Sequence, residues 1–475
     1  MIHIAEFILA GSIAMLTLYA IRHYVLTLAR VSLRDPIDTG ALAGYKMPSV
    51  SVLIPMHNEE AVAADILEAL LECDYDWQRL EILAIDDRST DRTGEIIDEF
   101  AKLSPIVTAI HRTTGEGGKP AALKVATARA KGDILLLFDA DYVPGRALLK
   151  QLVAPFADPQ VGAVMGRVVP HNVGQSVLAS LLSLERAAGY QVGQQVRHQL
   201  GLSAQFGGTV GGVRVTALRA VGGWNTESLT EDTDLTCRLL LEGWRVAYVN
   251  RAECYEEVPQ TWPVRRKQLM RWVTGHTECL HRYGWDLMLA KNLRFGQKVD
   301  SIFMLACYWT APAMLLAWLS SLAIFISGHA GALVAVTIGI YFTGYQLFAN
   351  QASFFEIGTA ALLDGSTERV LLLPMNMLNF FASTTAICSA LVRFYGRKFF
   401  GLGSGPWHKT KRFRGSNGNG NGNGNGNGNG NGNGNGNGHG NGNGNGGPRN
   451  TTPPDPFMVR GPSGLYVYSS EGPWA

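Results

Sequence analysis

The chain has 475 residues, enough for two or three structural units and a sizeable core. Charged residues make up only 17% of the sequence and hydrophobic residues 46%, which predicts a globular domain joined to membrane segments. The net charge of +2 is nearly balanced and gives no reason to expect nucleic acid as a partner. The six cysteines are scattered without a C-x-x-C pair, so neither a zinc site nor a disulfide framework is indicated.

The first hydrophobic segment lies near the N-terminus. Residues Phe7–Leu28 are largely apolar, and a helix of about 20 such residues spans a bilayer. No basic region precedes this segment and no A-x-A cleavage signal follows it, which favours a membrane anchor over a removable signal peptide. Arg22, Arg30 and Arg34 lie towards its C-terminal side, so the positive-inside rule places the following chain in the cytosol.

From Ser49 to about Tyr248 the chain alternates short apolar runs with helical patterns. Such runs are typical of buried parallel strands, and their alternation with helices predicts a doubly wound α/β sheet. Ligands bind such sheets at the carboxyl ends of the strands, so functional residues are expected directly after the apolar runs. The predicted strands are Val50–Ile54, Glu81–Ile85, Ile134–Phe138 and Ala163–Val169, and the predicted helices include Ala61–Glu72 and Thr93–Lys102.

A second hydrophobic block begins after residue 300. Ser301–Ile326, Ala330–Phe348 and Val370–Val392 are candidate spans, whereas Gln351–Leu363 carries Glu356 and favours an interfacial helix. Three spans behind a cytosolic domain would leave the tail outside, yet the basic residues after Val392 indicate a cytosolic tail. Either Gln351–Leu363 makes a re-entrant passage or one span is miscounted, and the sequence leaves both open. The basic residues are Arg393, Arg397, Lys398, Lys409, Lys411, Arg412 and Arg414.

The last part of the chain is of low complexity. From Asn417 to Gly447 it alternates Asn and Gly, apart from His439, and cannot bury a core, so a flexible tether is predicted. The segment Pro448–Ala475 is proline-rich and contains Tyr466, Tyr468 and Trp474. A disordered end is the favoured interpretation, with a docking peptide as the alternative.

Acidic residues follow two of the predicted strands. Asp139 and Asp141 come directly after Ile134–Phe138. Two carboxylates at a strand end can hold a hard divalent ion such as Mg²⁺ or Mn²⁺ against a diphosphate, although acidic loops after strands are common. Asp86 and Asp87 follow Glu81–Ile85, where carboxylates suit hydrogen bonding to a base or ribose.

Three further elements carry candidate chemistry. The glycines before Lys119 let the backbone approach a ligand, and Lys119 can meet phosphate as a point charge, although the spacing of a P-loop is missing. Glu231 and Asp232 open a predicted helix, either as capping residues or with one of them as a general base.

The third element is the basic stretch from Arg265 to Trp272 just before the membrane block. Its basic residues could be lipid-facing anchors, but arginine also binds diphosphate bidentately. Trp272 could be an ordinary interfacial tryptophan, or its flat face could stack on sugar rings.

In this order, the five elements resemble those of the family 2 glycosyltransferases. The resemblance is strongest to the membrane-integrated branch that includes cellulose, chitin, hyaluronan and poly-N-acetylglucosamine synthases, and it runs from about Ser49 to Arg412. Two departures are His57, where relatives often carry an aromatic residue, and the segment Gln205–Thr209, which lacks the cysteine of cellulose synthases. The matching motifs are Pro55-Met56-His57-Asn58-Glu59, Asp86-Asp87, Lys119, Asp139-Ala140-Asp141, Thr230-Glu231-Asp232, the Q-x-x-R-W at Gln268–Trp272 and a W-x-K-T-like segment at Trp407-His408-Lys409-Thr410.

The resemblance implies a GT-A-like (Rossmann-like) nucleotide-sugar-binding α/β domain flanked by transmembrane helices, with inverting chemistry. It makes Asp232 the catalytic base and gives the metal, Mg²⁺ or Mn²⁺, to Asp139 and Asp141. The donor is expected to be a UDP-sugar, with GDP-mannose left open. The implied nucleotide-sugar ligands are His57, Glu59, Asp86, Asp87, Lys119, Asp139 and Arg271, and the implied acceptor ligands are Glu231, Gln268 and Trp272.

These observations predict a multi-pass protein of the inner cell membrane with a cytosolic catalytic domain. Elongation of a β-linked polysaccharide is the favoured function; transfer of one sugar to a lipid is the alternative, and any export or regulatory partner is unknown. A channel or transporter with a nucleotide-sensing domain is disfavoured by the few spans and the absence of an inverted repeat. The predicted parts are an anchor at 1–35, the catalytic domain at 36–285, interfacial and transmembrane helices at 286–400, a basic juxtamembrane segment at 401–416, the linker at 417–447 and the tail at 448–475.

Overall fold

The computed structural model describes residues 2–33, 46–115, 117–327 and 351–400, together with two short strands at 458–460 and 466–468. The chain forms two units, Met1–Gly415 and Ser416–Ala475. Of the second unit, the structure describes only an antiparallel pair, β9 (Met458–Arg460) and β10 (Tyr466–Tyr468). The flexible tether and disordered tail otherwise remain predictions. The candidate span Ala330–Phe348 and the segment at Trp407 lie outside the described residues.

The first unit contains an eight-stranded mixed sheet in the order β3-β2-β1-β4-β7-β6-β8-β5. The four predicted strands are confirmed and run in one direction, but a short antiparallel strand, β7, separates β4 from β6. A wholly parallel sheet is therefore wrong. The strands are β1 (Val50–Met56), β2 (Leu80–Asp87), β3 (Val107–Arg112), β4 (Ile134–Leu137), β5 (Val143–Pro144), β6 (Val161–Pro170), β7 (Gly211–Arg214) and β8 (Arg245–Glu256).

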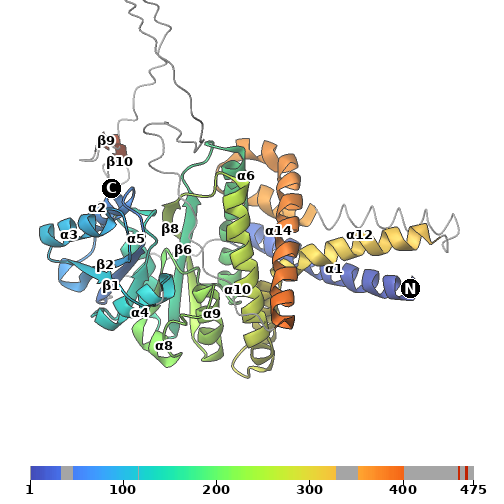
Figure 1. The fold of residues 1–475 in the computed structure, drawn as a ribbon, viewed down its shortest axis with the longest axis horizontal. Coiled ribbons are helices and arrows are strands. Elements are labelled where there is room, and N and C mark those ends of the chain that lie inside the picture. Colours follow the sequence, from blue (N-terminus) through green and yellow to red (C-terminus); the bar gives the residue numbers. More distant parts are fainter. Residues whose placement is uncertain are drawn as a thin grey trace, which may run out of the picture. The chain divides into compact units, whose positions relative to one another are not determined.

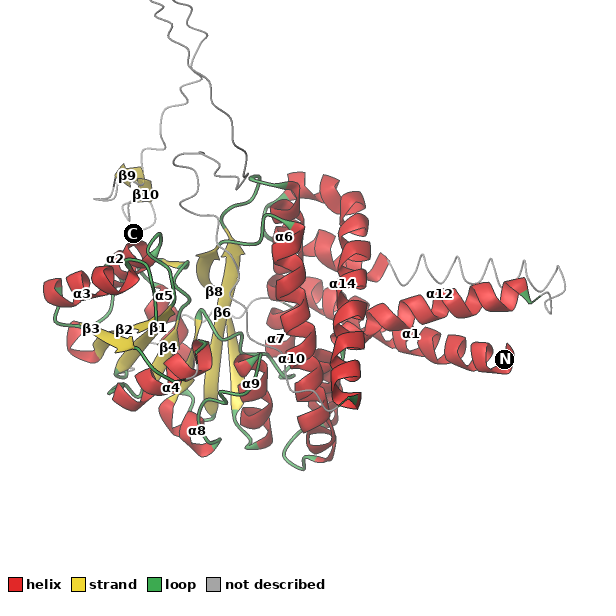
Figure 2. Cartoon of the chain, in the orientation of Figure 1, coloured by secondary structure: helices red, strands yellow, loops and turns green. Residues whose placement is uncertain are grey.

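Helices cover the sheet on both faces and form an α/β domain around one large core (Figure 2). The strands carry near-continuous buried apolar runs because both faces are covered. α6 continues through a π-helical turn, η3, into α7. The helices of this domain are α2 (Ala63–Leu71), η1 (Trp77–Arg79), α3 (Thr93–Leu103), α4 (Lys119–Arg129), α5 (Leu148–Val153), η2 (Ala154–Ala157), α6 (Val177–Ala187), η3 (Ala188–Gln194), α7 (Gln195–Gln199), α8 (Val215–Ala220) and α9 (Glu231–Leu241).

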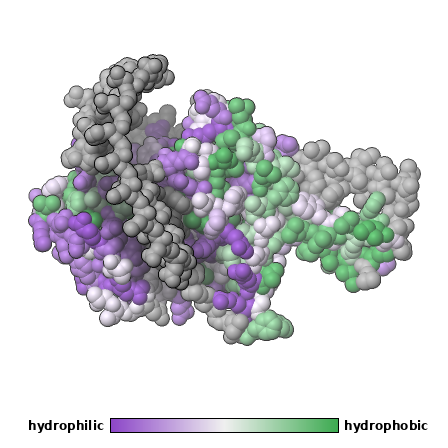
Figure 3. Space-filling model, turned by 45° about the horizontal axis from the view of Figure 1, so that its top comes forward, coloured by the Kyte–Doolittle hydropathy of each residue, from purple (hydrophilic) through white to green (hydrophobic). Residues whose placement is uncertain are grey.

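The remaining helices lie on one side of the α/β domain, and α1 and α12 project from it together (Figure 1). Within the part of the chain that the structure describes, three segments are long and apolar enough to cross a membrane: Ile2–Ser32, Cys307–Ile326 and Thr367–Phe399. Figure 3 shows hydrophobic residues gathered at this end and hydrophilic residues over the α/β domain. The helices are α1 (Ile2–Ser32), α10 (Trp262–Leu289), α11 (Phe295–Leu305), η4 (Cys307–Trp309), α12 (Thr310–Ile326), η5 (Thr367–Leu372) and α14 (Leu373–Phe399), and residues 351–363 are also helical.

The predicted span Ser301–Ile326 begins too early. Ser301 is buried in α11, where its hydroxyl lies 2.9 Å from that of Ser203 in the α/β domain. The apolar segment of sufficient length therefore starts at Cys307. Periodicity could not locate this boundary, because an apolar helix face packed on a domain looks like one facing lipid.

A buried carboxylate joins α1 to the α/β domain. Asp300 of α11 lies 3.0 Å from Arg22 of α1 and 2.8 Å from Arg197 of α7. The two guanidiniums lower the pKa of Asp300 although its burial opposes this. Arg30 of α1 donates a further hydrogen bond of 2.8 Å to the carbonyl of Gln191. The C-terminal half of α1 is therefore fixed to the domain, and the charge of Arg22 is compensated.

Candidate active site

The acidic pair after β4 lies beside the first residue of α4. The Lys119 ammonium contacts Asp139 Oδ1 at 2.6 Å, and the Asp139 amide donates to the Thr209 hydroxyl at 3.1 Å. Asp141 follows with only 1% of its surface exposed. Three segments far apart in the sequence, at 119, 139 and 209, therefore meet at the carboxyl end of β4.

Asp232, in the first turn of α9, lies against the same loop. Gly208 has φ of +74°, and a Cβ at this position would lie 3.0 Å from Asp232 Cβ and 3.3 Å from Asp232 Oδ2. The loop is tied to α9, since the Gln205 amide group donates to Thr233 Oγ1 at 3.0 Å. Because Thr209 contacts Asp139 and its neighbour Gly208 contacts Asp232, the loop brings the acidic pair and the predicted base together.

Two more of the predicted site residues, Glu231 and Arg271, interact electrostatically with this group. Burial would lower the pKa of Lys119, but the carboxylates of Asp139, Glu231 and Asp232 raise it above its usual value. Burial and the Asp232 charge raise the pKa of Glu231 to about 7, opposed by Lys119 and Arg271. Lys119, Asp139, Glu231, Asp232 and Arg271 thus form one electrostatically coupled cluster.

The two acidic residues after β2 differ in their surroundings. The buried Asp87 carboxylate accepts hydrogen bonds from Arg112 at 2.7 Å and from the Gly118 amide at 2.9 Å. It therefore holds the glycine turn that precedes Lys119. Asp86 Oδ1 caps the Ser89 amide at 2.9 Å, and its Oδ2 lies 3.2 Å from His111 Nδ1. Nucleotide contacts of both aspartates remain predictions.

The segment after β1 contains two more of the residues predicted to bind the nucleotide sugar, His57 and Glu59. The His57 Nδ1 atom donates to the Asp87 carbonyl oxygen at 2.7 Å, so the ring is fixed at the tips of β1 and β2. Glu59 is buried, and its amide donates to the Thr93 hydroxyl at 2.8 Å. Asn58, between them, adopts φ of +53°. Such backbone geometry at the carboxyl edge of a sheet is common at binding sites.

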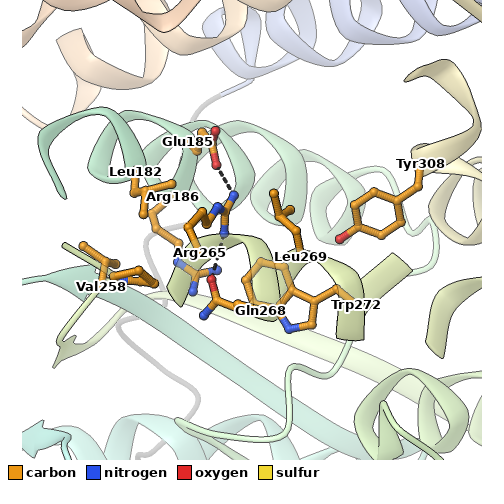
Figure 4. Close-up of a pocket in the computed structure, with 10 residues that line it drawn as sticks. Leu182, Glu185, Arg186, Val258, Arg265, Gln268, Leu269, Trp272 and Tyr308 are labelled. Atoms are coloured by element: carbon orange, nitrogen blue, oxygen red, sulfur yellow. Dashed lines mark hydrogen bonds and ion pairs between the residues drawn. The ribbon is translucent and has the colours of Figure 1, made fainter. Parts of the chain in front are cut away.

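Gln268 and Trp272 line a pocket of about 250 Å³ between α6, α10 and η4 (Figure 4). Two guanidiniums lie near the Trp272 ring, with Arg186 at 5.4 Å and Arg265 at 5.3 Å from its centroid. Arg265 donates to Gln268 Oε1 at 2.9 Å. The pocket is also lined by Leu182, Glu185, Val258, Pro259, Leu269 and Tyr308.

Each arginine of this pocket has a carboxylate partner. Arg265 contacts Glu185 at 2.6 Å, and Arg186 contacts Glu256 at 2.6 Å. The pocket therefore combines an aromatic surface with compensated charge. Glu185 in turn accepts a hydrogen bond of 2.6 Å from Asn379 of α14.

One helix connects this pocket to Asp232. A Cβ at Gly275 of α10 would lie 2.3 Å from Thr230 Oγ1, so α10 packs directly on the residue before Glu231. His276 donates through Nδ1 to the Trp272 carbonyl at 3.1 Å and packs edge-on against Tyr308. Burial lowers the pKa of His276, and the charge of Asp232 opposes the shift. Helix α10 therefore joins the pocket to the start of α9, which carries Glu231 and Asp232.

Several of these residues carried no signal in the sequence. Glu185, Arg186 and Glu256 belong to a helix and a strand without a recognisable motif, and their importance follows only from their contacts. His276 could have been noticed, since it lies four residues after Trp272 and therefore on the same helix face. Among the described residues, no group of three or more His, Cys, Asp and Glu side chains forms a metal cage.

Comparisons with known proteins identify the family. The model of the family described as "Glycosyltransferase like family 2" matches residues 48–275. A β-monoglucosyldiacylglycerol synthase from Nostoc sp. is 31% identical over 346 residues, which cover 72% of this chain and 73% of that protein. The chain belongs to glycosyltransferase family 2. It is therefore an enzyme rather than the channel or transporter considered from the sequence.

Two further comparisons agree with this family and fold. A probable glycosyltransferase, YdaM of Bacillus subtilis, is 34% identical over 234 residues, 49% of this chain and 56% of the relative. The chain thus spans little more than half the length of that relative. The structure of the mannosyltransferase PcManGT from Pyrobaculum calidifontis, solved with GDP-Man and Mn²⁺, covers 76% of this chain and 97% of that one at 22% identity and a TM-score of 0.52. The expected GT-A-like fold of this glycosyltransferase is borne out, whereas a processive polysaccharide-synthase type is not shown.

Proposed function

We propose that this glycosyltransferase transfers a single sugar from a nucleotide-sugar donor to a lipid acceptor at the membrane surface. The observation that carries the proposal is the pocket of Gln268 and Trp272, which is lined by Tyr308 at the start of a candidate span. Its helix α10 packs on Thr230, the residue before the acidic pair Glu231 and Asp232. The Nostoc relative is named for glucosyl transfer to diacylglycerol. This support favours the single-sugar alternative over the polysaccharide elongation that the sequence motifs suggested.

The donor diphosphate binds beside Lys119 and Arg271 in this proposal. Both cations belong to the cluster that contains Asp139 and Glu231. They stabilise the negative charge that develops on the leaving nucleoside diphosphate, a contribution that is usually the largest in such reactions. Asp86, Asp87, His57 and Glu59 are proposed to serve the nucleotide end at the tips of β1 and β2.

Asp139 and Asp141 would hold a divalent ion, Mg²⁺ or Mn²⁺. Two carboxylates separated by one residue fit such an ion only if the donor phosphates complete its oxygen shell, since the described residues provide no cage of three ligands. The Lys119 contact with Asp139 would loosen when the ion and the diphosphate bind. When bound, the ion would neutralise diphosphate charge during transfer.

Asp232 is the proposed general base. Its Oδ1 accepts from the Thr233 amide at 2.7 Å, whereas a Cβ at Gly208 would lie 3.3 Å from its Oδ2. The acceptor hydroxyl would give its proton to this carboxylate as its oxygen attacks the anomeric carbon in line with the leaving diphosphate. An α-linked donor then yields a β-linked product.

Gln268, Trp272 and Glu231 are proposed to position the acceptor. The compensated arginines of the pocket give it no net attraction for a phosphate group. The pocket therefore suits the neutral hydroxyl of a diacylglycerol-like lipid better than a lipid phosphate. The apolar helices α1 and α12 are proposed to cross the inner membrane, with the catalytic domain on the cytosolic side.

Product length tests the proposal. Membranes containing the protein are incubated with diacylglycerol and, in turn, UDP-glucose, UDP-N-acetylglucosamine and GDP-mannose, and lipid and polymer fractions are separated. One glycolipid carrying one sugar is expected with one of the donors. A ladder or a polymer that grows with time would restore the polysaccharide alternative, and nucleotide release without any glycosylated lipid or polymer would overturn both.

A further inference from the structure

Helix α14 is long and apolar enough to cross a membrane, but it packs against helices of the catalytic domain that cannot lie within the bilayer. From Leu373 to Val392 it carries no charged residue, and together with η5, as Thr367–Phe399, it meets the length and composition of a span. Length and composition cannot distinguish a helix that spans the bilayer from one that lies along its surface. The contacts of α14 decide between the two.

α14 runs beside α10 in the same direction (Figure 1). Near its beginning, Asn379 contacts Glu185, the partner of Arg265. In its second half, Ala390 and Leu391 pack on Val273 of α10. Further along, the Tyr395 hydroxyl lies 2.8 Å from His281 Nε2. The contacts thus advance along both helices together.

α10 is part of the catalytic domain and cannot lie in hydrocarbon. It packs on α9 in a cluster that includes Cys237, Leu240, Cys279 and Leu287. A charged side chain within the bilayer is costly and needs a partner or water, and α10 carries several. A helix that runs beside α10 cannot leave the domain surface to cross the membrane. The charged residues of α10 from 265 onwards are Arg265, Arg266, Lys267, Arg271, Glu278, Arg282 and Asp286.

The polarity of the first half of α14 is the reverse of that expected for a helix on a water-soluble domain. The buried face is polar in the first half of the helix, with Asn379 only 1% exposed, whereas Ala386, Ala390 and Leu391 are buried in the second half. The opposite face is apolar, with Leu378 68% and Val392 73% exposed. Residues seven apart share a helix face, and the exposed positions Leu378, Thr385, Val392 and Phe399 mark one stripe along α14, which Leu371 of η5 extends. The other buried polar residues are Asn376, Ser383 and Thr384.

The position of the projecting helices identifies lipid as the partner of this stripe. α14 passes across α12, where Phe381 meets Trp318 with ring centroids 5.8 Å apart (Figure 1). α1 and α12 pack on each other and carry exposed leucine, isoleucine and phenylalanine side chains. Three exposed cations, Arg393, Arg397 and Lys398, lie near the end of α14, where they suit anionic headgroups.

We propose that α14 lies in the plane of the membrane and does not cross it. Its apolar stripe occupies the boundary between headgroups and acyl chains, and its buried face, which carries Asn379, closes the catalytic domain next to the acceptor pocket. Both ends of α14 are then on the cytosolic side. The conflict between three predicted spans and a basic cytosolic tail disappears, because Val370–Val392 is the miscounted span.

Cysteine labelling from the two sides of the membrane tests this placement. Glu368→Cys and Lys398→Cys introduce thiols at exposed positions near the two ends of the helix, in a Cys388→Ser background. A membrane-impermeant maleimide is applied to intact spheroplasts and to inverted vesicles. His3→Cys at the start of α1 and Lys124→Cys on α4 report the two sides. We expect both α14 thiols to react only in inverted vesicles, as Lys124→Cys does. Reaction of the two from opposite sides would overturn the proposal.

Spin-label depth gives a second measurement that does not depend on sidedness. Single labels at the five stripe positions are compared by oxygen accessibility in proteoliposomes, using variants that retain transferase activity. An in-plane helix predicts similar depth at all five positions. A depth maximum at Thr385 with shallow ends at Leu371 and Phe399 is the pattern of a span and would contradict the placement.

Discussion

Replacing Gly208 by alanine should impair catalysis far more than it impairs folding. Gly208 has φ of +74° and contacts Asp232. The left-handed backbone costs a residue with a Cβ roughly 1–2 kcal/mol. In addition, the new methyl group would lie 3.0 Å from Asp232 Cβ, whereas carbon atoms pack at about 3.5–4.0 Å. Asp232 must therefore move by about 0.5 Å or more.

A shift of this size has a predictable effect on rate. A misplacement of about 1 Å can cost about 100-fold, so we expect kcat to fall at least about 10-fold in Gly208→Ala while donor binding is kept. Gly174→Ala is the matched control, because Gly174 has φ of +88° but no atom within 4 Å of its Cβ position. The assay is nucleoside diphosphate release from donor and acceptor, with thermal unfolding in parallel.

Comparing the two variants separates the cost of the left-handed backbone, which both share, from the displacement of Asp232, which only Gly208→Ala causes. Both should lose similar stability, and only Gly208→Ala should lose activity. Wild-type turnover in Gly208→Ala, or an equal loss of turnover in Gly174→Ala, would refute the conclusion that this loop positions Asp232.

Three further predictions concern the coupled cluster and the pocket. Lys119→Met should raise the donor KM and lower kcat, together at least about 100-fold in kcat/KM, because it removes the cation beside Asp139; unchanged donor kinetics would remove Lys119 from the diphosphate site. Burial and the charge of Asp232 raise the pKa of Glu231 from 4.5 to about 7, so the folded protein binds the Glu231 proton more tightly than the unfolded chain does. The free energy of unfolding should therefore fall by up to about 3 kcal/mol as the pH rises from about 4.5 to about 7. Glu231→Gln should flatten this part of the pH profile in thermal unfolding, and an unchanged slope would contradict it. Glu185→Gln weakens the contact with Arg265 at 2.6 Å and should raise the acceptor KM about 5- to 100-fold with donor binding unchanged; a change confined to the donor KM would contradict it.

The strand ends were predictable from the sequence because the signal is local. An apolar run followed by acidic residues marks both the strand and the edge at which ligands bind, as at Asp86 and Asp139. The beginning of α9 was predictable for the same reason, since Glu231 and Asp232 suit the positive end of a helix dipole. These elements lie as expected in the structure.

The partners of these residues were not predictable. β7 has only four residues, two of them glycine, and is too short to show a period. The pairing of Asp87 with Arg112 and of Arg265 with Glu185 joins segments far apart in the chain. Such contacts depend on the sheet order and on helix packing, which leave no local pattern. The contacts of α14 belong to the same class, because α10 and α6 select the face that it buries.

The most direct measurement compares Asp232→Asn with wild type in the same membranes. Nucleotide binding and lipid glycosylation are followed separately. We expect the variant to bind nucleoside diphosphate with an unchanged Kd and to transfer sugar at less than about 1% of the wild-type rate, since a general base supplies about 10²–10⁴-fold. Wild-type transfer by Asp232→Asn would contradict the assignment of the base and the geometry that unites residues 119, 139, 232 and 271.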